Sequence, residues 1–179
     1  MKKTILITGA TDGIGKETAK KLVHEGHHLL VHGRDASKVD ALVTELGGET
    51  QGYVADLSNL VEVSSLAKEI KKNHQAIDVL INNAGVFKVP DVRTKEGLDV
   101  RFAVNTIAPY ILTQELHPLL TKGSRVVNLS SAAQAPVEMD ALLGKIPLPD
   151  STAYAQSKLA LTMWTNYLSQ QDEWKDRVV

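Results

Sequence analysis

Short apolar runs of strand length alternate along this chain with longer segments in which apolar residues recur at helical spacing. The short runs are apolar without strict alternation, which is typical of parallel strands that helices cover on both faces. This order predicts an α/β fold with a doubly wound parallel sheet in three layers. The expected strands are Thr4–Thr8, Leu29–His32, Gln51–Ala55, Ile77–Ile81 and Arg125–Leu129. The expected helices are Gly13–Glu25, Ser37–Leu46, Leu60–Lys72, Gly97–Leu120 and Thr152–Leu168.

Two segments, Ala84–Lys95 and Ala132–Ser151, show neither the strand nor the helix period. The second contains Pro136, Pro147 and Pro149, and loops of such length in compact domains often close over binding sites. No repeat or low-complexity linker divides the chain. We therefore expect a single domain over residues 1–179.

Composition and charge narrow the class of protein. Of the 179 residues 43% are hydrophobic, and 20 Lys and Arg face 21 Asp and Glu. The apolar content suits a packed core, and the balanced charge argues against a nucleic-acid partner or a basic membrane-binding arm. No apolar run is long enough to span a membrane, the N-terminus does not resemble a signal peptide, and cysteine is absent. These features predict a cytoplasmic domain without disulfides.

A glycine-rich turn, TGATDGIG over Thr8–Gly15, joins the first expected strand to the first expected helix. Glycine permits a tight turn and lets a diphosphate approach the backbone closely. The N-terminus of the helix adds free N–H donors and the positive end of the helix dipole. The strand–turn–helix context therefore predicts a dinucleotide-binding site.

The turn resembles the glycine motif of the short-chain dehydrogenases/reductases, and further motifs of that family follow in order. They are Asp56-Leu57, Asn82-Asn83-Ala84-Gly85, the helical Asn105, Ser130-Ser131 at a strand end, and YAQSK over Tyr154–Lys158. The resemblance covers the whole chain. It implies a Rossmann-like NAD(P)-binding domain and an oxidoreductase that interconverts an aldehyde or ketone and an alcohol by hydride transfer.

The same resemblance implies two sets of site residues. The cofactor-binding residues would be Thr8, Gly9, Thr11, Asp12, Gly13, Ile14, Gly15, Arg34, Asp56, Leu57, Asn83, Ala84, Gly85, Tyr154 and Lys158. The catalytic residues would be Asn105, Ser131, Tyr154 and Lys158.

Tyr154 and Lys158 lie four positions apart, so on a helix both side chains share one face. A neutral tyrosine is a weak base, and a neighbouring ammonium stabilises the phenolate form. The pair therefore fits general acid–base chemistry, and the resemblance also places Lys158 on the nicotinamide ribose. Ser131 would hydrogen-bond the substrate oxygen, with Ser130 as the alternative contact.

Asn105 precedes Pro109 in the long expected helix. Because proline lacks an N–H and kinks a helix, the backbone carbonyl of Asn105 could stay free to hold a water molecule. The resemblance makes this water part of a proton relay that connects Lys158 to solvent.

Arg34 follows the second expected strand, in the sequence Gly33-Arg34-Asp35. NAD-binding proteins place an acidic residue at that strand end, against the ribose 2′-hydroxyl. Glycine occupies that place here, and the adjacent guanidinium can bind a 2′-phosphate. We therefore expect NADP(H) in preference to NAD(H). A shift of one residue would instead make Asp35 the ribose contact.

The connection between Ser131 and Tyr154 is longer than in compact family members and rich in proline. In this it resembles the retinol-dehydrogenase-like and WW-domain-oxidoreductase-like branches, and this resemblance implies an apolar substrate. The apolar side chains that would line the substrate mouth are Leu142, Leu143, Ile146 and Leu148. A loop that only packs on the domain is the alternative.

His24, His27, His28 and His32 cluster in sequence without convergent carboxylate or cysteine support, so we expect no metal site. Family members commonly pair the Asn105 and Tyr154 helices between subunits, which implies a homodimer or homotetramer.

Two other functions stay open at this stage. One alternative is a non-catalytic NADP-binding sensor or scaffold, and the other is an epimerase or dehydratase that uses the same tyrosine and lysine. The final residues, Arg177–Val179, resemble the start of a sixth strand, and the family's last strands and substrate segment do not follow. We therefore expect a chain truncated relative to its family, with weak or no activity as a 179-residue species.

Overall fold

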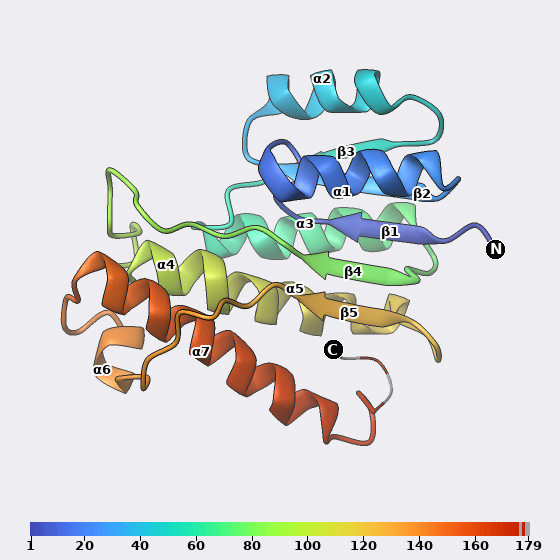
Figure 1. Ribbon diagram of the computed structural model, residues 1–179. Coiled ribbons are helices and arrows are strands. Elements are labelled where there is room, and N and C mark those ends of the chain that lie inside the picture. Colours follow the sequence, from blue (N-terminus) through green and yellow to red (C-terminus); the bar gives the residue numbers. More distant parts are fainter. Residues whose placement is uncertain (176, 178–179) are drawn as a thin grey trace.

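Five parallel strands form one sheet in the order β3-β2-β1-β4-β5 in the computed structural model, which describes residues 1–175 and 177 (Figure 1). The strands are β1 (Thr4–Ile7), β2 (His28–Gly33), β3 (Gln51–Val54), β4 (Val79–Asn82) and β5 (Arg125–Asn128). The strand order reverses between β1 and β4. In open α/β sheets, ligands bind beyond the carboxyl ends of the strands at such a switch point.

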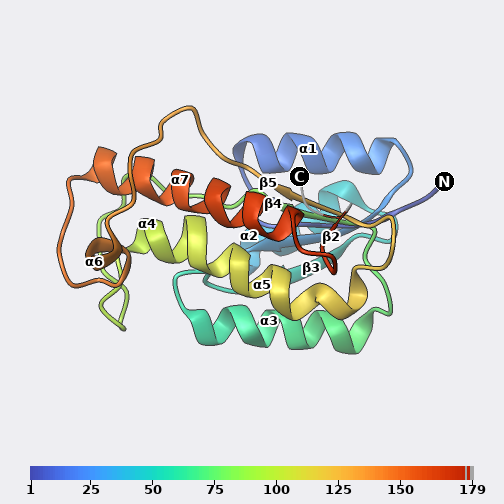
Figure 2. The same ribbon diagram turned by 90° about the horizontal axis from the view of Figure 1, so that it is seen from below.

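Helices cover both faces of the sheet, so the predicted three-layer α/β fold is confirmed (Figure 2). The helices are α1 (Gly13–His24), α2 (Ala36–Leu46), α3 (Leu60–Asn73), α4 (Val100–Phe102), α5 (Ala108–Leu116), α6 (Met139–Leu142) and α7 (Asp150–Ser169). A π-helical turn, η1 (Ala103–Ile107), joins α4 to α5, and a 3-10 turn, η2 (His117–Leu119), follows α5.

The central strand β1 contributes to two separate cores. Leu6 packs with residues of α3 and α5, whereas Ile5 and Ile7 pack with residues of α1 and α2. Successive side chains of a strand point to opposite faces, and helices cover both faces here, so all three side chains are buried. This explains the continuous apolar run of the sequence, and burial stabilises the fold by about 1.5–3 kcal/mol for each such side chain.

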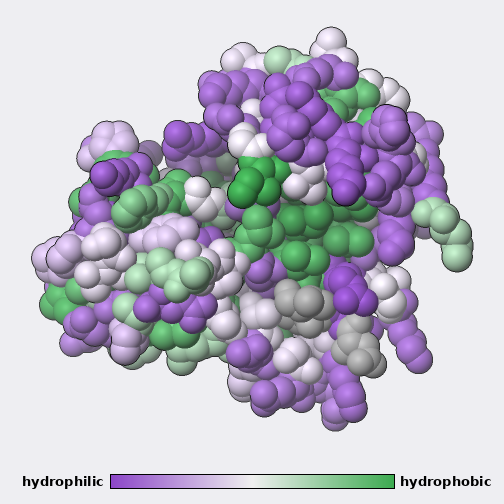
Figure 3. All heavy atoms as spheres, viewed as in Figure 1, coloured by the Kyte–Doolittle hydropathy of each residue, from purple (hydrophilic) through white to green (hydrophobic). Residues whose placement is uncertain are grey.

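The face toward α1 is covered unevenly. Val79 and Ile81 of β4 are only partly buried on this face, and Figure 3 shows an apolar area beside α1. At the outer edge of the sheet, the N–H of Val126 in β5 donates to the carbonyl oxygen of Arg177 over 2.6 Å. The rest of the expected sixth-strand start, residues 178 and 179, lies outside the described residues.

The segment Gly97–Leu120, expected as one helix, is divided into α4, η1, α5 and η2. The Asp99 side chain caps α4 by accepting the N–H of Arg101, so the helix begins after Gly97. Pro109 lies in the first turn of α5, where its missing N–H is tolerated. The irregular turn therefore precedes the proline, and Asn105 lies within it.

Other element boundaries move by one or two residues from their expected places. The N–H of Ile77 donates to the carbonyl of Leu119 over 2.9 Å instead of entering the sheet. Strand β4 therefore begins at Val79.

Candidate functional site

The glycine turn after β1 contains positions where a side chain has no room. Gly9 has a φ of +63°, and an added Cβ would lie 2.8 Å from the Cα of Ala84. An added Cβ at Gly15 would lie 2.2 Å from the carbonyl oxygen of Gly9. Gly13, with a φ of +52°, has nothing within 4 Å of its added Cβ. Close packing on one side and open space on the other form the cradle that a diphosphate needs at a helix N-terminus.

Hydrogen bonds fasten this turn to the segment after β4. Thr8 Oγ1 accepts the backbone N–H groups of Asn83 and Ala84, each over 3.1 Å. Asn83 Nδ2 donates to the carbonyl oxygens of Thr8 and Gly9 over 2.9 and 3.0 Å. Thr8 and Asn83 therefore hold the ends of β1 and β4 together.

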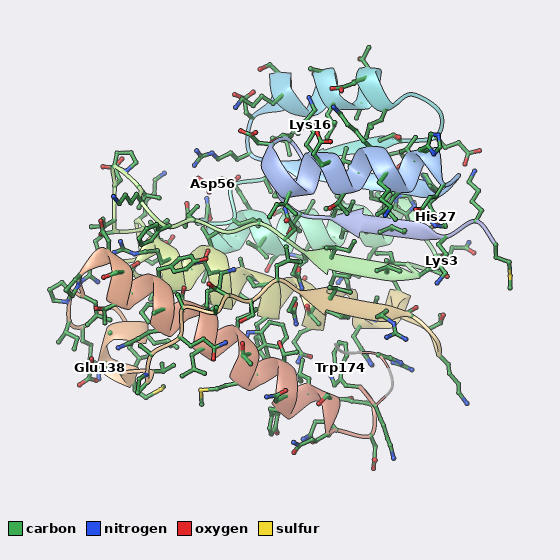
Figure 4. All side chains as sticks on the ribbon, viewed as in Figure 1. Lys3, Lys16, His27, Asp56, Glu138 and Trp174 are labelled. Carbon is green, nitrogen blue, oxygen red and sulfur yellow. The ribbon has the colours of Figure 1, made fainter. Side chains whose placement is uncertain are left out.

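A cleft of about 450 Å³ opens at the carboxyl ends of the strands. Its lining is Gly9, Thr11, Asp12, Gly13, Ile14, Gly15, His32, Gly33, Arg34, Ala55, Asp56, Leu57, Asn83, Ala84, Gly85, Val86 and Val104. Figure 4 labels Asp56 at these carboxyl ends, close to the start of α1. The cleft thus gathers the predicted cofactor residues apart from Thr8, Tyr154 and Lys158, which are not in its lining.

Five lining residues were not predicted as cofactor contacts: His32, Gly33, Ala55, Val86 and Val104. Gly33, Ala55 and Val86 each adjoin a predicted contact in the sequence, and this position is the signal that could have identified them. His32 and Val104 carry no motif, because their place depends on how separate strands and helices pack.

A second, more open hollow of about 720 Å³ lies along the outside of α1. It is lined by residues of that helix and its cap, among them Lys16 (labelled in Figure 4) and Lys20. Both lysines form ion pairs with Glu45 of α2, over 2.8 and 2.9 Å. A hollow lined by one helix and its cap, in which Lys16 and Lys20 are already paired, offers no polar groups that converge from different elements on a ligand.

His32 is buried on the floor of the 450 Å³ cleft, and both of its ring nitrogens have partners. Nδ1 lies 3.3 Å from the donating backbone nitrogen of Gly9. Nε2 lies 3.0 Å from the carbonyl oxygen of Ala55. Burial lowers the pKa of His32 below its ordinary value, while hydrogen bonding to Ala55 and the charge of Asp56 oppose this shift.

Asp56 and Leu57 follow β3 at the far side of the cleft. The Asp56 carboxylate accepts the N–H and the hydroxyl of Ser58 over 2.9 and 2.8 Å. The backbone N–H of Asp56 donates to Glu62 of α3 over 2.8 Å. The Asp56 side chain therefore has a defined position at the cleft wall, with Leu57 buried behind it.

The three residues at the end of β2 differ in what they offer the cleft. An added Cβ at Gly33 would lie 2.6 Å from Thr11 Cγ2, so an acidic residue at the strand end would require the Thr11 side chain to move. Arg34 is exposed and lines the cleft. Asp35 instead caps α2, where its carboxylate accepts the Ser37 hydroxyl over 2.6 Å and the Lys38 N–H over 3.2 Å. The Ser37 hydrogen bond lowers the pKa of Asp35.

Lys158 lies on α7 with its ammonium inside the protein. Nζ donates to the carbonyl oxygen of Leu129 over 2.7 Å, and the residue is 5% exposed. Burial lowers the pKa of Lys158. An added Cβ at Gly85 would lie 3.4 Å from Lys158 Nζ and 3.4 Å from Asn105 Oδ1. The ammonium therefore reaches the back of the cleft wall, although Lys158 is not in the lining.

Tyr154 lies one helical turn before Lys158, and Lys158 Nζ is 6.0 Å from its ring centroid. On its other side, the ring of Phe87 lies 5.0 Å away between centroids. The backbone carbonyl of Tyr154 accepts the hydroxyl of Ser157 over 2.7 Å. Helical spacing brings Tyr154 and Lys158 together, as expected.

The Asn105 side chain connects η1 to two other parts of the site. Oδ1 accepts the N–H of Val86 over 2.8 Å, and Nδ2 donates to the carbonyl of Val86 over 2.9 Å. Nδ2 also lies 2.9 Å from Ser157 Oγ on α7. Pro109 has no N–H, so the backbone carbonyl of Asn105 lacks its α-helical partner. The hydrogen bond of Ser157 was not predicted, although the serine within YAQSK could have indicated it.

The two serines after β5 have different surroundings. The hydroxyl of Ser130 lies 2.7 Å from Thr162 Oγ1 and 3.3 Å from the carbonyl of Lys158, both on α7. The hydroxyl of Ser131 accepts the N–H of Ala133 over 3.1 Å. Ser130 thus holds the strand end against α7, whereas Ser131 keeps its own proton available for another acceptor.

The two segments without periodicity fold against each other. The guanidinium of Arg93 donates to the carbonyl oxygens of Gly97 and Gly144, over 2.6 and 2.7 Å. Earlier in the second segment, the backbone N–H of Glu138 donates to Gln156 of α7 over 3.0 Å, and Figure 4 labels Glu138 at this place. The second segment is therefore attached to the protein at two points, Glu138 and Gly144.

The apolar residues expected at the substrate mouth are only partly at the surface. Leu143 and Ile146 are exposed, whereas Leu142 and Leu148 are half-buried. Residues 1–175 and 177 contain no cluster of three or more side chains suited to hold a metal ion. Over the same residues, no helix has both the length and the apolar character needed to cross a membrane.

Comparison with known proteins identifies relatives of the whole chain. A family model described as short chain dehydrogenase matches residues 3–178. Retinol dehydrogenase 13 of Homo sapiens is 35% identical, over 94% of this chain and 54% of its own length. The WW domain-containing oxidoreductase of Drosophila melanogaster is 35% identical, over 98% of this chain and 46% of its own length. A metagenomic short-chain oxidoreductase solved in complex with NADP has a TM-score of 0.75 and 32% identity, over 94% of this chain and 75% of that one.

This chain spans about half the length of the curated relatives it matches. The expected likeness to the retinol-dehydrogenase-like and WW-domain-oxidoreductase-like branches is confirmed by these relatives. The family match extends over the glycine turn, the cleft and the Tyr154–Lys158 helix alike. The chain belongs to the short-chain dehydrogenase family.

Proposed function

We propose that this chain binds a nicotinamide dinucleotide in the cleft and acts as an NAD(P)-dependent oxidoreductase that interconverts a carbonyl and an alcohol. The buried Lys158 ammonium carries this proposal, because it lies behind Gly85 of the cleft wall and one helical turn from Tyr154. Burial of a lysine costs free energy, so such a position favours a functional role over a structural one. When bound, the nicotinamide supplies or accepts the hydride.

The residues of the glycine turn fit such a cofactor. The cradle of Gly9, Gly13 and Gly15 together with the N-terminus of α1 would hold the diphosphate. Asp56 and Leu57 would hold the adenine end, and Lys158 with Tyr154 the nicotinamide ribose, as the family resemblance implies. The proposed domain, residues 1–179, thus contains the cofactor cleft.

Four side chains would act on the substrate. Tyr154 would give a proton to the substrate oxygen during reduction, or take one during oxidation. Ser131 would donate a hydrogen bond to the same oxygen, because its proton is not used by Ala133. Lys158 would stabilise the tyrosinate, and Asn105 would hold a water on its backbone carbonyl to replace the proton from solvent.

Arg34 supports a preference for NADP(H). It is exposed and lines the cleft, Gly33 supplies no acid at the strand end, and Asp35 is engaged in capping α2. Loss of the hydrogen bonds between one guanidinium and a phosphate costs about 1.5–3 kcal/mol of binding free energy. Arg34→Ala should therefore weaken NADPH about 10- to 150-fold and NADH far less, measured by fluorescence titration. Equal losses for both cofactors would contradict the role of Arg34.

Tyr154→Phe tests the acid–base role. Turnover of NADPH over a panel of aldehydes and ketones should fall at least about 100-fold, while NADPH affinity stays within a few fold. Equal turnover in the variant would refute the role of Tyr154. A wild-type protein that binds NADPH but turns over no substrate would favour a sensor or scaffold instead.

The surroundings of Tyr154 support an apolar substrate. Phe87 is packed against the Tyr154 ring and partly exposed, and Leu143 and Ile146 are exposed on the neighbouring segment. Phe87→Ser should raise the KM of an apolar aldehyde more than that of a small polar one.

We also propose a homodimer or homotetramer through the face of α5 and α7. Tyr167 and Met163 are 62% and 56% exposed, and Tyr110 of α5 is half-exposed against Trp164. Tyr167→Glu should shift the mass measured by light scattering toward the monomer, and an unchanged mass would refute this interface.

A further inference from the structure

The buried histidine at the floor of the cleft makes two hydrogen bonds that constrain its protonation. Because the N–H of Gly9 donates to it, Nδ1 of His32 must be an acceptor. Because the carbonyl of Ala55 can only accept, Nε2 must carry the hydrogen. The neutral ring with its proton on Nε2 is the one state that satisfies both partners.

The two partners belong to different parts of the cleft. Gly9 lies in the glycine turn after β1, and Ala55 directly precedes Asp56 after β3. The backbone of His32 links the same segments, since its carbonyl accepts the N–H of Ala10 over 2.9 Å. The ring therefore sets the spacing between the turn that would hold the diphosphate and the segment that would hold the adenine.

We infer that His32 is a positioning residue for the cofactor. Its neutral ring keeps the glycine turn and the segment after β3 at the spacing that the cofactor needs, and protonation of the ring weakens cofactor binding. A protonated ring would direct an N–H at the N–H of Gly9, so the bond to the glycine turn would be lost and replaced by repulsion. The inference rests on the cofactor binding proposed above. It adds a residue whose type none of the family motifs specifies.

Charged groups near the ring limit this effect without removing it. Asp56 favours the charged ring, and its neighbour on α3 is Glu62. Asp12 and Arg34 line the same cleft from the glycine turn and the end of β2. Burial outweighs the charge of Asp56, so the pKa of His32 lies below its ordinary value. Neutral His32 therefore prevails near pH 7, and protonation belongs to the acid range.

Two substitutions separate the two bonds of the ring. His32→Asn places an amide oxygen near the position of Nδ1, so the bond from Gly9 is kept and the titration is removed. His32→Gln places an amide nitrogen near the position of Nε2, so the bond to Ala55 is kept and that from Gly9 is lost. His27→Asn is the matched control, because Nδ1 of His27 also accepts a backbone N–H, that of Lys3, over 3.3 Å. Figure 4 labels His27 and Lys3 at the opposite, amino ends of the strands.

The dissociation constant of NADPH, measured by fluorescence from neutral pH down to the lowest pH at which circular dichroism shows a folded protein, tests the inference. We expect the ratio of the wild-type constant to the His32→Asn constant to rise about tenfold toward acid, as one buried hydrogen bond is lost. Titration of the NADPH phosphates cancels in this ratio. His32→Gln should bind NADPH about tenfold more weakly than wild type at neutral pH, and the ratio of its constant to that of His32→Asn should not change with pH. His27→Asn should follow wild type.

A ratio that does not change with pH, or the same acid loss in His32→Asn, would overturn the inference. Ring nitrogen chemical shifts of His32 in the cofactor-free protein give an independent measurement, which does not need a folded variant. We expect the neutral ring with the proton on Nε2 at pH 7, and a charged ring or the other neutral form there would also overturn it. If wild type binds no NADPH at any pH, the proposed function fails, while the ring shifts still decide the protonation of His32.

Discussion

The close approach of Gly9 to Ala84 gives a measurable prediction about stability. Gly9→Ala would place a methyl group 2.8 Å from the Cα of Ala84, which is backbone and cannot turn away. The left-handed φ of +63° adds about 1–2 kcal/mol for any residue with a Cβ. Overpacking at the contact adds about 1–3 kcal/mol. We therefore expect the free energy of unfolding to fall by about 2–5 kcal/mol.

Gly26→Ala is the matched control for the backbone contribution. Gly26 ends α1 with a φ of +85°, and its added Cβ would have nothing within 4 Å. Both substitutions replace glycine by alanine at positive φ, so they share the backbone strain and the change in the unfolded chain. The difference between the two variants therefore isolates the contact with Ala84, about 1–3 kcal/mol.

Urea unfolding of the cofactor-free protein, followed by circular dichroism, measures both variants. The slope of free energy against urea should stay constant, so that the midpoints report stability alone. If Gly9→Ala loses no more free energy of unfolding than Gly26→Ala, the glycine turn does not lie close enough to the segment after β4 for an added methyl group to collide with it. Glycine is then not required at this position to bring the two segments together.

Two further predictions concern buried charges. Arg101 is 1% exposed and its guanidinium donates two hydrogen bonds to Asp99, over 2.9 and 2.7 Å. Arg101→Met should lower the free energy of unfolding by about 3–5 kcal/mol, because it leaves the Asp99 carboxylate buried without its ion pair. Asp150→Asn at the half-exposed partner of Arg101 should cost less than about 1 kcal/mol in the same urea assay, and equal losses would contradict the argument. Burial lowers the pKa of Lys158 in the folded protein below 10.5, its ordinary value in the unfolded chain. At a pH between the folded and the unfolded pKa, the unfolded chain binds more protons, so the stability of the wild type should rise with pH relative to that of Lys158→Met. The expected rise is about 1.4 kcal/mol for each pKa unit of the shift. Parallel stability curves for Lys158→Met and wild type would show that the ammonium is not desolvated.

Local pattern was sufficient to predict the elements that depend on neighbouring residues. The short runs predicted all five strands. In β1 and β2 nearly every position is buried, and a strand that is covered on both faces favours successive apolar side chains. The four-residue spacing of Tyr154 and Lys158 predicted their shared face for the same local reason. The order of motifs also identified the family, since each motif occupies its own strand end or helix.

The long expected helix shows where local pattern is insufficient. Periodicity alone could not divide Gly97–Leu120, because the π-helical and 3-10 stretches, of 5 and 3 residues, are too short to show a period of their own. Pro109 pointed to an irregularity, but its place before the proline depends on how the surrounding elements pack. The Asn105 side chain in that turn bonds to Val86 and Ser157, which lie on other elements.

The sequence by itself determined the α/β fold, the family and the candidate site residues, because these follow from local periods and short motifs. Only the tertiary structure decided that Lys158 is buried against Leu129 and that His32 joins Gly9 to Ala55. Among four neighbouring histidines, nothing in the local pattern distinguishes the one in the cleft. Its role comes from burial and from hydrogen bonds between segments more than twenty residues apart, which packing of the whole sheet brings together.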